Sequence, residues 1–204
     1  AFAFVLFALL RFRSTGRLRW LMALPPVFAL WVNLHFGYVT GLGLIGLFTV
    51  AGLAERHIGA FGRQAEPGTL SAGKALVLLF ACTIATGVNP YGWQVLAETF
   101  SMSSVNMNTD IVDWMSPDFR QWRSQVFLLP VAMMFVARAL ACRRPAWLDL
   151  LLPLAMVGVA LYSQRHIALA SIALAPMIAR ALADWSPGTL WTSTSPAVAR
   201  WQAT

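Results

Sequence analysis

Polar residues interrupt a pattern of long apolar runs along this chain. The segment 20–54 contains no Asp, Glu, Lys or Arg, and the sequence NLHFG lies near its middle, at 33–37. A single helix over this segment would be roughly 52 Å long, which exceeds the ~30 Å of hydrocarbon in a bilayer. The pattern therefore predicts two membrane crossings, 20–33 and 36–54, joined by a turn at NLHFG.

Five further apolar runs extend this prediction to an all-α, polytopic transmembrane helical bundle of about seven segments. The five runs lie at 1–10, 75–90, 125–141, 148–163 and 166–183. We expect residues 1–183 to form the transmembrane domain, with 91–124 as its largest loop and 184–204 as a tail. Pro25 and Pro26 predict a kink in the second segment, because proline removes backbone donors. The first segment begins without an initiator Met, so we expect the chain to be the C-terminal part of a longer protein.

Composition agrees with a membrane protein and excludes several other classes. Hydrophobic residues make up 58% of the chain and charged residues 11%, whereas soluble domains carry roughly a quarter charged residues. The net charge of +7 comes from basic residues in short clusters between apolar runs, which argues against a nucleic-acid partner. Cys82 and Cys142 lack metal-ligand spacing. The GLGLIG sequence at 41–46 follows no strand, so it predicts close helix packing rather than a nucleotide site.

The basic residues also predict which side of the membrane each loop faces. Lys and Arg accumulate in short cytoplasmic loops, and placing 11–19 inside puts 55–74, 138–147 and the tail inside as well. Twelve of the 15 basic residues then belong to the cytoplasmic side: Arg11, Arg13, Arg17, Arg19, Arg56, Arg63, Lys74, Arg138, Arg143, Arg144, Arg180 and Arg200. A single crossing over 20–54 would weaken this asymmetry, so the two-crossing interpretation is preferred.

Three polar turns are then expected on the outer face. They are 33–36, the pair formed by 89–93 and 113–119, and 164–167. Polar residues at this depth are costly unless they are paired or line a wet cavity, which makes them candidate site residues. The substrate-binding candidates are Asn33, His35, Asn89, Asp113, Trp114, Asp118, Arg165 and His166.

Most of these candidates also have a structural interpretation. Asn33 is typical of a helix C-terminus, His35 of an interfacial histidine bonded to a backbone carbonyl, and Asn89 of a turn before proline. The two aspartates, Asp113 and Asp118, are typical of loop residues that cap short helices. Two His and two Asp are residue types that bind divalent ions, but their spacing matches no metal signature, so no cofactor is predicted.

Arg165 is harder to explain by structure alone. Its planar guanidinium suits a phosphate, or a carboxylate such as Asp113 or Asp118.

Trp residues at the predicted interfaces are typical of an aromatic belt. Trp114 is the exception, because it lies within the candidate site and has a ring that suits sugar stacking.

Four motifs together resemble a family. The sequences WVNLHFGYVTGLGLIGLF (31–48), NPYGW (89–93), DWMSPDF (113–119) and QRHIALASIALAP (164–176) resemble, in this order, a group of bacterial multi-pass inner-membrane proteins. Members are similar to C-type glycosyltransferases, which use polyprenyl-phosphate-linked sugars at the outer face of the membrane. Asp113 stands where many relatives have Glu.

The resemblance implies a site but no catalytic residue. In those enzymes the catalytic acid lies in the first outer loop, upstream of this chain, so the catalytic residue here is unknown. Arg165 and His166 would meet the donor phosphate, with Arg120 or Arg123 as a further candidate. The remaining candidates would line the sugar pocket or orient hydroxyl groups. Membrane lipids and a polyprenyl-phosphate sugar are the implied partners. The alternatives are a non-enzymatic subunit or scaffold whose loop 91–124 docks a protein partner and, third, a transporter.

Overall fold

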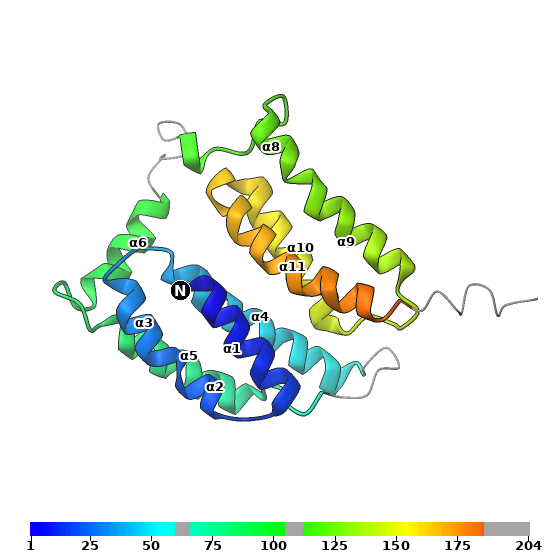
Figure 1. Cartoon of the computed structure of the whole chain (residues 1–204). Helices are drawn as coiled ribbons and strands as arrows, with labels where there is room; N and C mark the ends of the chain where they lie inside the picture. The colour runs from blue at the N-terminus through cyan, green and yellow to red at the C-terminus, as the bar shows by residue number, and fades with distance from the viewer. Residues whose placement is uncertain (60–65, 105–111, 186–204) are drawn as a thin grey trace, which may run out of the picture.

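The fold is described by a computed structural model that covers residues 1–59, 66–104 and 112–185. All regular elements in these residues are helices, as the apolar pattern predicts (Figure 1). In chain order they are α1 (Phe2–Thr15), α2 (Arg19–Met22), α3 (Leu24–Val32), α4 (Tyr38–His57), α5 (Ala72–Thr86), α6 (Gln94–Ser104), η1 (Val112–Trp114), α8 (Trp122–Val126), α9 (Leu128–Leu140), α10 (Trp147–Tyr162), η2 (Gln164–His166) and α11 (Ile167–Ala183).

The predicted membrane segments correspond to helices, but fewer are long enough to cross a bilayer. Three helical stretches are long and apolar enough by length and composition: Tyr38–His57, Trp122–Leu140 and Gln164–Ala183. The apolar stretches Arg19–Val32, Ala72–Thr86 and Trp147–Tyr162 are shorter. The structure therefore supports an all-helical chain with three candidate crossings, and the larger number expected from the sequence stays a prediction.

The two halves of the long uncharged segment are separated as the sequence predicts. α3 ends at Val32 and α4 begins at Tyr38, with the NLHFG turn between them. A break at Ala23 divides the first half into α2 and α3, just before the two prolines. Part of the predicted loop 91–124 is helical, because α6, η1 and the start of α8 lie within it. Most of the predicted tail lies outside the described residues, as do Arg63, Asp110 and Arg200.

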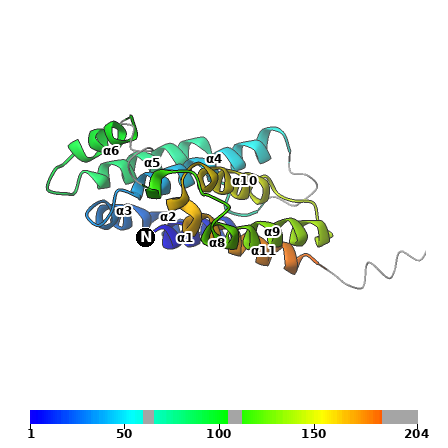
Figure 2. The same ribbon diagram turned by 90° about the horizontal axis from the view of Figure 1, so that it is seen from above.

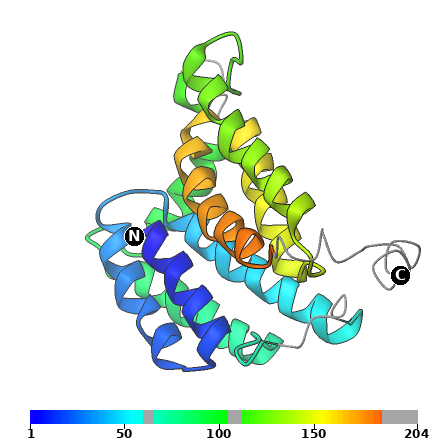
Figure 3. The same ribbon diagram turned by 45° about the vertical axis from the view of Figure 1, so that its right-hand side comes forward.

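The helices form two layers that split into two groups. Figure 2 shows α4, α5 and α10 in one layer and α1, α2, α3, α9 and α11 in the other. In Figure 3, α9, α10 and α11 stand together beside the group α1 to α5. Contacts between α10 and α4, and between α1 and α11, join the two groups.

Apolar side chains cover the outer faces of several helices as well as the core. The core contains Phe12, Phe28 and Leu174, all at most 2% exposed. On the outer faces, Phe80 of α5 is 69% exposed and Phe135 of α9 is 73% exposed. Large exposed apolar surfaces on a monomer mark contact with a membrane or a partner, because water solvates them poorly.

A close approach of α3 to α4 depends on Gly41. A Cβ at this position would lie 2.6 Å from Trp31 Cζ3 and 2.8 Å from Phe28 Cζ. The rings of Phe28 and Trp31 contact each other with centroids 5.8 Å apart. Gly43 and Gly46 of the same GLGLIG sequence have no such neighbour within 4 Å. The predicted close packing is therefore found at one of the three glycines.

A network of buried charges joins the two groups of helices at one end. Arg13 of α1 pairs with Glu55 of α4 and, at 2.9 Å between Nε and Oε2, with Glu66 of the segment before α5. Arg180 of α11 also pairs with Glu66, and its Nε lies 3.5 Å from Asp149 Oδ1 of α10. Arg13 and Asp149 are each 3% exposed. The network thus connects four helices through one shared carboxylate.

Gly68 lets the segment after Glu66 pass against α1. Its N–H donates to the Arg13 carbonyl at 3.0 Å, and a Cβ at position 68 would lie 1.9 Å from the Phe12 carbonyl oxygen. No side chain fits in that space without moving the backbone. The segment is therefore locked to the C-terminal end of α1.

Gly41→Ala and Gly43→Ala form a matched pair within α4. We expect Gly41→Ala to lower the free energy of unfolding by about 1–3 kcal/mol, because the added methyl group overpacks the two rings. Gly43→Ala meets no atom and replaces glycine in a helix, so a gain of up to ~1 kcal/mol is expected. Unfolding by SDS in mixed micelles measures both, and equal effects would contradict the described packing.

Arg13→Met tests the buried network against Arg11→Met, two residues earlier in α1. Removing Arg13 leaves the buried Glu55 carboxylate without its partner, which costs roughly 3–5 kcal/mol in comparable buried pairs. Arg11 is exposed and contacts the Trp20 ring, so its replacement should lower stability by about 0.5–1 kcal/mol, much less than the loss of Arg13. The same micelle titration measures both variants. A stable Arg13→Met protein would show that the network does not hold the groups together.

Candidate functional site

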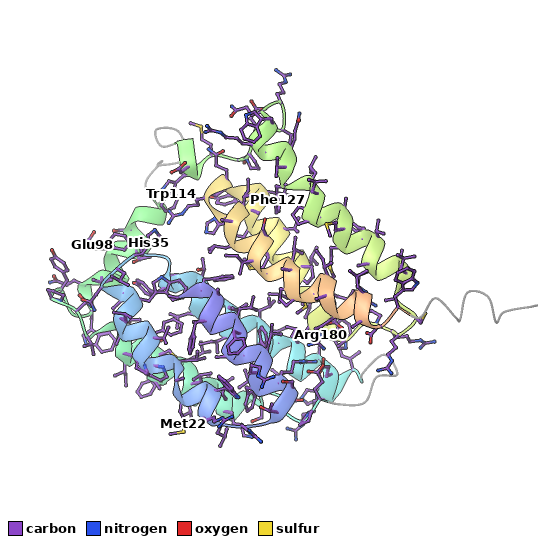
Figure 4. The ribbon with its side chains drawn as sticks, viewed as in Figure 1. Met22, His35, Glu98, Trp114, Phe127 and Arg180 are labelled. Atoms are coloured by element: carbon purple, nitrogen blue, oxygen red, sulfur yellow. The ribbon has the colours of Figure 1, made fainter. Side chains whose placement is uncertain are left out.

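A cavity of about 840 Å³ lies at the end of the molecule opposite the charge network. It lies where the N-terminus of α1, the α3–α4 turn, α6, η1, η2 and α11 meet. Its polar lining residues are His35, Thr40, Thr99, Asp113, Arg165 and His166, and its apolar ones include Phe2, Trp31, Phe36, Val39, Trp114, Leu169 and Ile172. Figure 4 shows His35 and Trp114 at this end and Arg180 at the other. The cavity therefore has a polar wall at η1 and η2, formed by Asp113, Arg165 and His166, and a larger apolar lining.

Hydrogen bonds between two distant segments build the polar wall. We call residues 113–116 and 162–164 together the η1–η2 junction. Ser163 Oγ donates to the Asp113 carbonyl at 3.0 Å, and the Gln164 N–H donates to the Met115 carbonyl at 3.0 Å. Ser116 Oγ donates to the Tyr162 carbonyl at 3.3 Å. These bonds fix η1 beside η2. Asp113 and Trp114 of η1 therefore reach the same cavity as Arg165 and His166 of η2.

Arg165 and Trp114 contact each other across this junction. The Arg165 Cζ atom lies 4.3 Å from the centroid of the Trp114 ring, which is a close cation–π contact. No carboxylate of the described residues forms an ion pair with Arg165. Stacking on an aromatic face leaves the edges of the guanidinium plane available, and those N–H groups suit a phosphate or a carboxylate.

His35 reaches the cavity from the turn between α3 and α4. Its Nδ1 accepts a hydrogen bond from the Gly37 N–H at 2.7 Å, rather than donating to a carbonyl as the sequence suggested. An accepting Nδ1 places the proton of the neutral ring on Nε2. A Cβ at Gly37 would lie 2.9 Å from Nδ1. His35 is therefore held as a potential Nε2–H donor at the cavity.

Three sequence candidates lie outside the cavity, in local turns. Asn33 Nδ2 donates to the carbonyls of Ala29 and Val88, both at 2.7 Å, and so joins the α3 end to the α5–α6 turn. Asn89 Oδ1 accepts from the Tyr91 N–H at 2.8 Å.

Asp118, the third, behaves in the same way. Its Oδ1 accepts from the Arg120 N–H at 2.9 Å. Neither Arg120 nor Arg123 lines the cavity, and Arg123 stacks on Trp122 at 5.9 Å. Of the eight candidates, the structure brings together His35, Asp113, Trp114, Arg165 and His166 at one cavity, and their role as a substrate site stays a prediction.

Two threonines line the cavity without having been recognised from the sequence. Thr40 follows the α3–α4 turn, and its Oγ1 donates to the Gly37 carbonyl at 2.6 Å. Thr99 lies on α6, where its Oγ1 is 2.9 Å from the hydroxyl oxygen of the buried Tyr38. Val95 and Thr99 are one helical turn apart, so helical periodicity within the predicted loop is the signal that identifies this face.

Neither a metal site nor a homologue helps to assign the cavity. Among the described residues, no group of three or more His, Cys, Asp and Glu side chains is placed to hold a metal ion. Among protein families, curated proteins and solved structures, none matches this chain. The chemistry of the cavity must therefore be argued from its own residues.

Ser163→Ala tests whether the η1–η2 junction depends on its buried hydroxyl. The loss of a hydrogen bond of this kind costs about 0.5–1.5 kcal/mol, so exchange of the Gln164 N–H should accelerate roughly 2- to 10-fold. Ser171→Ala is the control, because Ser171 Oγ bonds only within its own helix, to the Ile167 carbonyl. Hydrogen–deuterium exchange measures both. Unchanged exchange at Gln164 would show that the other bonds suffice.

Proposed function

We propose that the chain is a multi-pass protein of the bacterial inner membrane with about seven membrane segments. We further propose that it forms the membrane portion of a glycosyltransferase-like enzyme that uses a polyprenyl-phosphate-linked sugar at the periplasmic face. The cavity is the single observation that carries this proposal. The four sequence motifs that resemble such proteins support it independently.

The arrangement of charges and apolar surface supports the membrane location. The paired charges Arg13, Glu55 and Arg180 lie near one end of the helices, whereas the outward faces of α5 and α9 expose phenylalanines. In water these apolar faces would favour aggregation, whereas lipid tails solvate them. Helices shorter than a full crossing are accommodated by local thinning of the bilayer or by flanking side chains that reach its surface.

The two walls of the cavity suit the two parts of such a donor. Arg165 offers guanidinium N–H groups to a phosphate, while its stacking on Trp114 limits the loss of side-chain freedom on binding. Asp113, the one carboxylate among the described lining residues, can accept from sugar hydroxyls. Phe2, Leu169 and Ile172 provide an apolar surface for the first part of a lipid chain.

Transfer would break the bond between the sugar and the lipid phosphate and form a bond to an acceptor oxygen. The electron pair of the broken bond goes to the phosphate oxygen that leaves the sugar, so a cation near this phosphate oxygen stabilises the transition state. Arg165 has this role in the proposal. The group that takes the proton from the acceptor oxygen is not assigned.

A non-enzymatic scaffold is the second candidate, and a specific observation favours it. Asn89 and Asp118 form hydrogen bonds within their own turns, and Asn33 joins two turns, so none of the three requires a ligand. In a scaffold the loop 91–124 would dock a protein partner. A transporter has less support, because its site is expected near the middle of the bilayer, whereas the cavity lies at the ends of the helices.

Binding of polyprenyl phosphate to the chain in nanodiscs tests the proposal. Arg165→Ala should weaken binding about 10- to 100-fold, because hydrogen bonds to charged groups contribute about 1.5–3 kcal/mol. Arg123→Ala removes an equal charge outside the cavity and should leave binding unchanged. The uncharged polyprenol should bind wild type and Arg165→Ala equally. A scaffold would bind neither lipid at this site, and an unaffected Arg165→Ala variant would refute the assigned role.

A further inference from the structure

A second candidate surface lies at the opposite end of the molecule from the cavity, on the outer side of α1. Arg13 points into the buried network, and Arg11, two residues earlier, is exposed on the other side of the helix. Phe4 and Phe7 of the same helix are 40% and 48% exposed. Phe7 precedes Arg11 by one helical turn, or ~6 Å along the axis. The outer face of α1 therefore changes from aromatic at Phe7 to cationic at Arg11 over ~6 Å. This is comparable to the distance between the edge of the hydrocarbon core and the phosphates in a bilayer.

Trp20 gathers two guanidinium groups at this position. The Cζ atoms of Arg11 and Arg19 lie 5.8 Å and 5.3 Å from the Trp20 ring centroid. Phe7 packs edge-on against the same ring at 5.4 Å. The Trp20 indole N–H is buried and has no hydrogen-bond partner in the described structure. One ring therefore positions two cations.

The end of α1 and the start of α2, which we call the α1–α2 corner, carry positive charge that no carboxylate of the described residues neutralises. Arg11, Arg17 and Arg19 form no ion pair with any carboxylate of the described residues. The carboxylates of the nearby network are already paired with Arg13 and Arg180. Three like charges within nine residues repel one another, and an anion between them would relieve the repulsion.

Exposed apolar side chains surround the same corner. Leu18 is 52% exposed and Met22 is 75% exposed, and Figure 4 shows Met22 at the edge of the molecule. A soluble anion such as free phosphate has no apolar part that could contact these side chains. A phospholipid does, because its acyl chains contact apolar residues while its phosphate contacts the arginines.

We propose that the α1–α2 corner binds an anionic phospholipid, with its phosphate between Arg11 and Arg19 and an acyl chain along Phe4 and Phe7. The site rests on the proposed membrane location but not on the cavity, which lies at the other end of the helices. Loss of this site therefore leaves binding of polyprenyl phosphate at Arg165 unchanged, and the two proposals fail separately.

Native mass spectrometry of the chain from nanodiscs tests the site. The nanodiscs contain equal amounts of phosphatidylglycerol and phosphatidylcholine, and the readout is the ratio of the two lipids retained. The double variant R11Q/R19Q should lower the phosphatidylglycerol preference about 10-fold. The control R143Q/R144Q removes two charges at the same end of the molecule, where Arg143 is 72% exposed and already lies near Asp184, and should keep the preference.

Two further arms decide the outcome. Inorganic phosphate in millimolar excess should not displace the lipid, and displacement would assign the site to free phosphate instead. Thermal unfolding must show that R11Q/R19Q remains folded, and the single variant R19Q serves if the double variant does not. Equal losses in the two double variants would mean that net charge alone attracts the lipid. That result, or no loss in either, would overturn the proposal.

Discussion

The shared carboxylate of Glu66 is the interaction on which the arrangement of the helices depends. Charges removed from water are costly unless each one is paired, and Glu66 satisfies Arg13 of α1 and Arg180 of α11 at once. The two groups of helices are thus joined at one end. At the other end turns rather than charges connect them, and the cavity lies there. The buried ion pairs and the candidate site thus lie at opposite ends of the helices.

Much of the fold follows from local features of the sequence. The uncharged segment 20–54 is too long for one crossing, and the structure ends one helix and begins the next around the polar turn within it. The break at Ala23 falls beside Pro25 and Pro26, where backbone donors are missing. Apolar runs and turn residues carry this information without any knowledge of distant contacts, which is why this helix break was predictable. α6, by contrast, lies within the predicted loop 91–124.

The site was only partly predictable, because its members are selected by contacts between segments. Asn33 and His35 lie in the same turn, yet one side chain bonds to the distant Val88 carbonyl and the other lines the cavity. Thr99 enters the site because Tyr38 holds α6 in place. Arg13 looks like an ordinary interfacial arginine beside Arg11 in sequence, and only the packing of α1 against Glu55 and Glu66 distinguishes the two. Residue type and spacing in the sequence do not show which distant residues these side chains contact.

The hydrogen bond from Gly68 to the Arg13 carbonyl has a consequence for the order of assembly. The last turn of α1 leaves carbonyl groups without partners inside its own helix, and the donor that completes one of them comes from the linker between α4 and α5. During synthesis this linker is made only after α4 has emerged. The C-terminal end of α1 therefore gains this hydrogen bond only after α4 and the linker have been made.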